Sequence, residues 1–166
     1  IFEDENVKKI SHDAKDAYIS LYKHGIILKG LEFDTAIAAY LLNPSESSYS
    51  VSDMSYKFLN ESIPTIKDIE DASKSQENTD IVKSYICTES IKVFKLYDVL
   101  REKLKDMDMA DLYYKVEHPL IEVLAYMEIE GFTVNKDMLI NLSEEFTKDI
   151  DRLTGQIYSY AGEEFN

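Results

Sequence analysis

The chain has 166 residues, of which 45% are hydrophobic and 30% charged, as is typical of a globular chain holding one domain or parts of two. A formal net charge of -14 repels phosphate backbones and disfavours this segment, alone, as a nucleic-acid clamp. The single cysteine, Cys87, excludes a disulfide framework, and no apolar run approaches the ~18 residues of a membrane span. We therefore expect a protein of the cytosol with no membrane partner.

Low glycine and proline contents indicate a mostly helical chain. Only five glycines and three prolines occur, so few sharp turns are available and long helices are favoured. The chain begins with Ile1 rather than Met and stops at Asn166 without a terminating signal. We expect it to be a piece of a longer protein.

The first elements are short. A strand is predicted near 7–10, and a helix is predicted over 13–23. This helix ends at Gly25, because glycine accepts the left-handed backbone of a helix C-terminus.

A second helix follows, with Asp34 or Thr35 as its N-cap and Asn43-Pro44 as its terminator. A third, shorter helix is predicted over 50–60. The stretch 61–80 is polar, contains a proline and lacks periodicity, which predicts a mobile loop.

Two long helical segments, 78–105 and 111–130, dominate the middle of the chain. The second has an apolar stripe formed by Val116, Leu120, Val123, Leu124 and Met127. Because Pro119 falls within it, a helix boundary or kink is expected near His118. Asn135 can cap the last helix, whose nearly heptad-spaced seam predicts antiparallel packing against 111–130; its members are Leu139, Leu142, Phe146, Ile150, Leu153 and Ile157.

Glu89 is a carboxylate placed among apolar positions of the helix predicted over 78–105. The apolar series on that face consists of Val82, Tyr85, Ile86, Val93, Leu96, Tyr97, Leu100 and Leu104. A buried carboxylate without a partner is strongly disfavoured. Glu89 is therefore a catalytic group, a metal ligand, a hydrogen-bonded structural acid, a relic, or simply a partly exposed acid at the edge of the face.

Other chemically active residues give weaker signals. His12, His24 and His118 have no spacing that suggests a metal site, and each is expected to be a surface or capping residue. Cys87 is expected to be a small core residue. The acid pair in Asp68-Ile69-Glu70 matches the DxE pattern of two-metal nucleases, but such matches arise by chance in a chain this acidic, and the pair lies in the predicted loop.

Three stretches together resemble the bacterial family A DNA polymerases. "GLEFDTAIAAYLLNP" (30–44) resembles the segment after the second motif of the 3'-5' exonuclease domain in that family. "HPLIEVLAYMEIEGFTVN" (118–135) resembles the start of the polymerase domain, and "IYSYAGEEFN" (157–166) the approach to the thumb. The order and spacing agree over nearly the whole chain.

This resemblance implies an origin for Glu89. The third exonuclease motif of the family is a tyrosine, three residues and an aspartate, and here it reads from Tyr85 to Glu89. The asparagine and aspartate of the second motif fall on Asp13 and Ala17, and the first motif would precede Ile1. Since such sites hold two metal ions with several carboxylates, we expect relic positions, no catalytic residue and no metal site.

The resemblance also implies the organisation of the chain. Residues 1–107 would be the later half of a degenerate ribonuclease H-like exonuclease domain, and 108–166 the start of the polymerase domain, with long antiparallel helices at the thumb base. The longer protein would be a DNA-directed DNA polymerase of replication and repair that uses Mg²⁺, DNA and deoxynucleotides. This segment would be a scaffold, without polymerase catalytic residues and without tight DNA binding of its own.

Two alternatives stay open. The chain could be a free-standing helical module that binds a protein partner through the seam over 139–157. The second alternative is that the chain retains residual nuclease activity. If Glu89 is a relic without a partner, Glu89→Leu should be neutral or stabilise the fold by roughly 1 to 3 kcal/mol. A clear loss of stability would instead indicate a hydrogen-bond partner.

Overall fold

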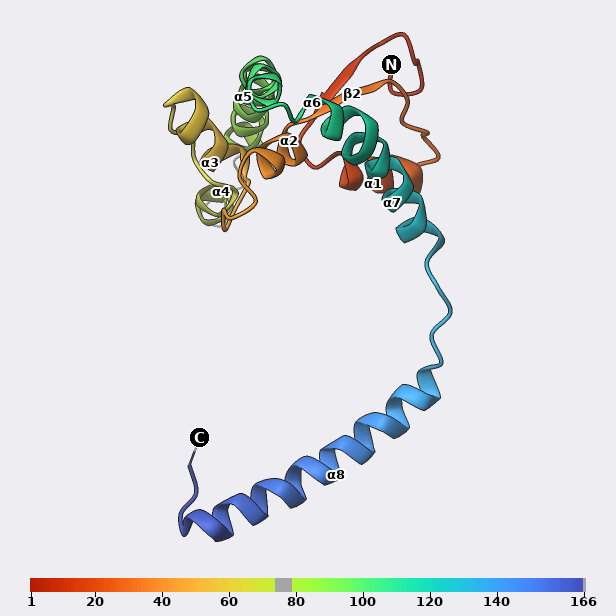
Figure 1. Ribbon diagram of the computed structural model, residues 1–166, viewed down its shortest axis with the longest axis vertical. Helices are drawn as coiled ribbons and strands as arrows, with labels where there is room; N and C mark the ends of the chain where they lie inside the picture. Colours follow the sequence, from red (N-terminus) through yellow and green to blue (C-terminus); the bar gives the residue numbers. More distant parts are fainter. Residues whose placement is uncertain (74–78, 166) are drawn as a thin grey trace. The chain divides into compact units, whose positions relative to one another are not determined.

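The computed structural model describes residues 1–73 and 79–165, which divide into two compact units, Ile1–Glu130 and Gly131–Asn166 (Figure 1). Helices predominate, and the first unit also contains a small parallel sheet. The elements of the first unit are, in chain order, β1 (Lys9–Ser11), α1 (Ala14–Lys23), β2 (Leu31–Asp34), α2 (Thr35–Leu42), α3 (Val51–Met54), the π-helical η1 (Ser55–Leu59), α4 (Ile66–Ser73), α5 (Thr79–Asp106), α6 (Ala110–Leu112), the π-helical η2 (Tyr113–Glu117) and α7 (His118–Glu130). The mainly helical class predicted from the sequence is confirmed.

The sheet pairs β1 with β2 in parallel, and α1 lies in the connection between the two strands. Ile10 is paired with Phe33 and Ser11 with Asp34, after an irregularity at Lys9. The strand predicted at 7–10 is present but begins and ends later. The strand β2 was not predicted, because its four residues run directly into the N-cap of α2 and its partner lies some twenty residues away.

Gly30, just before β2, is required by close backbone packing. Its φ is +69°, and an added Cβ would lie 2.8 Å from the carbonyl oxygen of Val7 and 2.9 Å from that of Glu5. The Gly30 carbonyl accepts a hydrogen bond from the amide of Lys9 at 2.9 Å. A side chain here would separate the residues before β1 from the start of β2.

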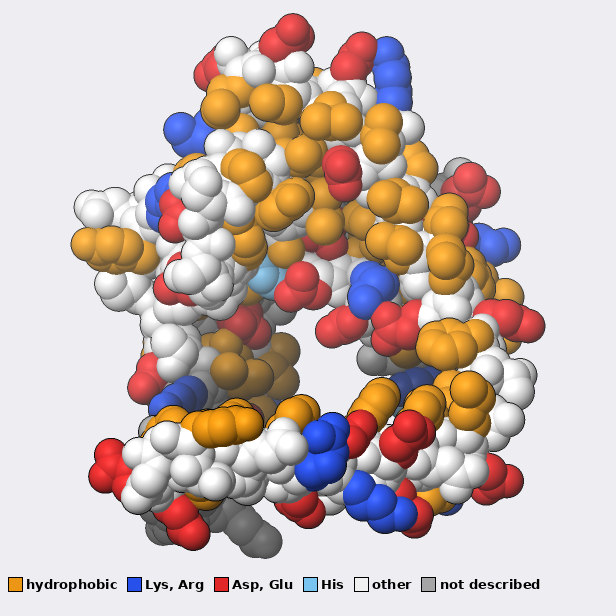
Figure 2. Space-filling model, turned by 60° about the horizontal axis from the view of Figure 1, so that its bottom comes forward, with side chains coloured by type: hydrophobic (Ala, Val, Ile, Leu, Met, Phe, Trp, Pro, Cys, Tyr) orange, Lys and Arg blue, Asp and Glu red, His pale blue; other side chains and the backbone are white. Residues whose placement is uncertain are grey.

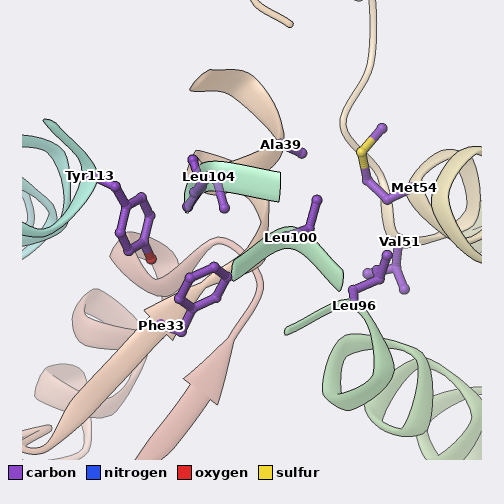
Figure 3. Close-up of a cluster of buried hydrophobic side chains, with 9 residues drawn as sticks. Phe33, Ala39, Val51, Met54, Leu96, Leu100, Leu104 and Tyr113 are labelled. Atoms are coloured by element: carbon purple, nitrogen blue, oxygen red, sulfur yellow. The ribbon is translucent and has the colours of Figure 1, made fainter. Parts of the chain in front are cut away.

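The larger core lies between α5, α2 and the sheet (Figure 3). Leu96, Leu100 and Leu104 of α5 are fully buried, as the apolar series predicts. Farther toward the N-terminus of α5 the prediction was wrong: Val82 and Ile86 lie on the same series but are 38% and 55% exposed. The fully buried residues of the described part of this helix lie in its C-terminal half.

Tyr113 of η2 anchors the end of β2 within this core. The Tyr113 hydroxyl accepts a hydrogen bond from the Asp34 amide at 2.7 Å and donates one to the Asp34 carbonyl oxygen at 3.2 Å. The Tyr113 and Phe33 rings are 4.8 Å apart between centroids. Burial raises the pKa of Tyr113. These contacts fix the start of α7 against the sheet.

A second cluster joins α1 to α7. Its buried members are Ala14, Tyr18, Leu28, Ile121 and Ala125. The predicted boundary near His118 is confirmed, because η2 ends at Glu117 and α7 begins at His118. The stripe predicted for this helix is, however, not the buried face: its members are exposed, from 39% at Leu120 to 64% at Met127. Because the helix is apolar on two sides, its periodicity alone did not identify which side is buried, and the predicted side was wrong.

The predicted loop over 61–80 contains helix. α4 occupies Ile66–Ser73 and α5 begins at Thr79, so the assignment of the whole stretch to a loop was wrong. Thr65 starts α4: its hydroxyl donates to the Asp68 carboxylate at 2.7 Å. Residues 61–65 contain no helix, as predicted, and residues 74–78 of the predicted mobile segment lie outside the described residues.

The second unit consists of an extended segment and α8 (Lys136–Ala161). As predicted, Asn135 caps this helix, its side-chain oxygen accepting from the Met138 amide at 3.0 Å. Gly162, with a φ of 78°, ends it. The predicted packing of this helix against 111–130 stays a prediction. In the part of the chain that the structure describes, no helix combines the length and apolar character that crossing a bilayer demands.

Candidate functional site

A hollow of about 490 Å³ lies between the end of β1 and the middle of α5, and Glu89 lines it. Its polar wall consists of Lys8, Ser11, His12, Glu89 and Ser90. Its apolar wall consists of Ile10, Val51, Ile86, Val93 and Phe94. Ligands of parallel sheets commonly bind at the carboxyl ends of the strands, and Ser11 and His12 lie at that end of β1.

Glu89 has a hydrogen-bond partner on its own helix. The Tyr85 hydroxyl donates to Glu89 Oε1 at 2.5 Å. Burial of the tyrosine and the adjacent carboxylate both raise the pKa of Tyr85. The Glu89 carboxylate is therefore partnered and half-buried, which agrees with the alternative of a hydrogen-bonded, partly exposed acid. Tyr85 and Glu89, which the resemblance assigns to the third motif, are thus hydrogen-bonded to each other.

His12 is tied to the start of α2. Its Nδ1 lies 2.9 Å from the Thr35 hydroxyl oxygen, and that oxygen lies 3.2 Å from the Ser11 carbonyl oxygen. The hydroxyl has one proton, so it donates either to the Ser11 carbonyl or to His12 Nδ1, depending on the tautomer of the ring. The Nε2 atom lies 3.8 Å from an Asp13 carboxylate oxygen. His12 is thus part of the wall of the hollow, with its ring held by Thr35.

The Asp13 side chain faces solvent and does not cap the helix that it precedes. Its backbone is left-handed, with a φ of 55°, its side chain is 67% exposed, and among the described residues that side chain makes no capping hydrogen bond. Asp34 takes that role instead. Its Oδ2 accepts from the Ala14 amide at 2.5 Å, and its Oδ1 accepts from the Ala36 amide at 2.8 Å. One buried carboxylate therefore caps both α1 and α2.

The electrostatics of Asp34 follow from its position. Burial raises the pKa of this carboxyl, while hydrogen bonds from the Ala14 and Ile37 amides act in the opposite direction. His12 lies close enough to favour the charged form, and Asp13 to oppose it. These bonds use both carboxylate oxygens of Asp34 in helix capping, which makes it a structural acid rather than a member of the hollow.

Ala17 belongs to a different region of the unit. It packs on the second cluster, between α1 and α7, and neither Ala17 nor Asp13 lines the hollow. Of the four predicted relic positions, Glu89 alone lines the hollow, with Tyr85 bound to it. The assignment of the four as relics stays a prediction. His12 was expected to be a surface or capping residue, but its side chain is 13% exposed and lines the hollow; its place two residues after the predicted strand was a usable signal.

The residues at this hollow do not fit a centre of two divalent ions. Such a centre needs several carboxylates around ions about 4 Å apart. Glu89 is the one carboxylate among the lining residues, it is bonded to Tyr85, and Lys8 adds a positive charge. Among residues 1–73 and 79–165, no group of three His, Cys, Asp or Glu side chains could hold a metal ion.

The outer surface of the chain is apolar in places and acidic in others. Figure 2 shows hydrophobic side chains in patches between scattered Asp and Glu. Cys87, expected in the core, is exposed. On α8 five of the six seam residues are exposed, from 47% at Leu153 to 62% at Ile150, and Leu142 is half-buried; among the described residues of that helix none is fully buried.

The comparisons with known proteins first define a class of domain. Residues 1–69 match the family model of the ribonuclease H-like domain of DNA polymerase I. This range contains both strands, α1 and α2, and therefore the strand end that forms one wall of the hollow. The α/β part of the first unit is ribonuclease H-like.

Longer matches point to DNA polymerase I over the whole chain. DNA polymerase I of Rhizobium leguminosarum is 31% identical over 171 residues, and that of Bacillus subtilis 29% over 166; these alignments cover 100% and 99% of this chain. The POL domain of Pol1 from M. smegmatis, solved in complex with a DNA primer-template and dNTP, matches 99% of the chain with a TM-score of 0.78 and 28% identity. The resemblance seen in the sequence is confirmed.

This chain spans only a part of those proteins. It covers 17% of the Rhizobium polymerase, 19% of the Bacillus polymerase and 26% of the M. smegmatis chain. The activity, substrates and partners of the whole polymerases are therefore separate from what these 166 residues show.

Proposed function

We propose that this chain is a structural section of a DNA-directed DNA polymerase, with a proofreading site that does not function. The observation that carries the proposal is the composition of the hollow: among its lining residues only Glu89 has a carboxylate, and that carboxylate is hydrogen-bonded to Tyr85. We assign Tyr85 and Glu89 to the third exonuclease motif from the resemblance in the sequence, and residues 1–69 match the ribonuclease H-like domain. The longer enzyme would copy DNA in replication and repair in the bacterial cytoplasm, with DNA and deoxynucleotides as partners and Mg²⁺ as its cofactor.

The role of the chain itself would be support. Residues 1–107 would form the degenerate exonuclease-like part, and 108–166 the start of the polymerase part at the thumb base. The cluster formed by α1 and α7 supports a close association, because it contains residues from both sides of that division. The boundary between compact units lies elsewhere, at residues 130 and 131, so the division at residue 107 is a proposal about domains of the family.

A nuclease assay tests the proposal. The chain is incubated with single-stranded DNA and either Mg²⁺ or Mn²⁺, and the DNA length is followed on a denaturing gel. We expect no shortening, because too few carboxylates surround the hollow to hold two ions. Shortening that disappears in Glu89→Ala and persists in Asp106→Ala, a matched change of an acid at the end of the same helix, would contradict the proposal.

One observation favours the alternative of a helical interaction module. The seam on α8 is exposed at every position but Leu142, which is the pattern of a helix that pairs with another. Sedimentation and a pull-down separate the two ideas. A module should capture one specific partner, and Phe146→Glu should abolish the capture. Without such a partner the polymerase section remains the better account.

A further inference from the structure

We draw no further inference here: the strongest candidate, the exposed apolar face of α7 that Leu120, Val123 and Met127 form beside Tyr22, is an unpartnered helix surface, and nothing in the structure shows what covers it.

Discussion

Asp34 caps two helices with one carboxylate, and only half of that role could be read from the sequence. An N-cap for α2 was predicted at Asp34 or Thr35 from local spacing, and the bonds to the Ala36 and Ile37 amides confirm it. The bond to the Ala14 amide crosses twenty residues and depends on β1 lying beside β2. Local patterns cannot show such a contact. Each cap is typically worth about 1 kcal/mol, so the residue stabilises both strand-to-helix connections.

At Glu89 the sequence located the residue but not its partner. Tyr85 is four residues away on the same helix, a spacing at which side chains meet, so the bond between them was open to prediction. The sequence analysis left open a hydrogen-bonded acid and a relic without a partner, and only the second predicted a neutral or stabilising Glu89→Leu. The bond to Tyr85 favours the first, so a loss of stability is expected.

Glu89→Leu should therefore lower the free energy of unfolding by about 1 kcal/mol, the usual worth of a hydrogen bond lost from a protein. Urea denaturation measures the change. In the Tyr85→Phe background the same substitution should cost much less, because the hydroxyl is already absent, and the two changes should couple by about 1 kcal/mol. Simple additivity of the two would mean that the bond contributes nothing.

His118 predicts a dependence of stability on pH. Burial holds the pKa of its imidazole below the ordinary 6.5, and its Nε2 is a buried atom with no hydrogen-bond partner among the described residues. The neutral ring is thus favoured in the folded chain. Its contribution is fully present above pH 6.5 and is lost as the pH falls through the lowered pKa.

The measurement is the urea midpoint between pH 7.5 and 5. In His118→Gln the midpoint should fall less over this range than in the parent chain, because the substituted side chain takes up no proton. His24→Gln, at the exposed end of α1, is the control and should fall as the parent does. An equal fall in all three chains would remove His118 as a source of the effect.

At the scale of elements, periodicity predicted where helices lie better than which face they bury. The long helices of the chain, α5 and α8, and the boundary before α7 agree with the sequence because their apolar spacing, caps and proline are local signals. The buried face of α7 does not agree with the prediction, because Ile121 and Ala125 pack on α1, a helix some hundred residues earlier in the chain. The strand β2 was missed for the same reason: a strand of four residues is defined by its partner.

Gly30, in the connection before β2, and Gly155, in α8, should respond differently to substitution by alanine. Gly30→Ala should destabilise the first unit by about 1 to 3 kcal/mol, because alanine is strained at a positive φ and its methyl group would meet two backbone carbonyl oxygens. Gly155→Ala is the matched change, in the interior of α8, with nothing within 4 Å of the added carbon. It should raise helix content by favouring the helix by about 0.5 to 1 kcal/mol.

Chemical denaturation followed by circular dichroism checks both substitutions. A Gly30→Ala chain as stable as the parent would show that the residues before β1 can move away from β2 without cost. Loss of helix in Gly155→Ala would contradict the open surroundings of that position.

At the scale of the whole molecule, the sequence identified the family and the structure defined the units. Three stretches spread from residue 30 to residue 166 carried the resemblance, and the matches to DNA polymerase I cover nearly the entire chain. Composition could not show that the compact units divide after Glu130, because that boundary depends on the packing of α7 on α1. It also could not show that Ala17 and Glu89 lie in different regions of one unit.

We propose that the residues of this chain at the hollow beside β1 do not hold a pair of catalytic metal ions. Titration of a ¹⁵N-labelled chain with Mn²⁺, read as paramagnetic broadening of amide signals, tests it most directly. We expect the amide signals of Ser11, His12 and Ser90 to broaden no earlier than those of exposed acids elsewhere, such as Asp106. Selective early broadening at those three residues, lost in Glu89→Ala and kept in Asp106→Ala, would contradict it.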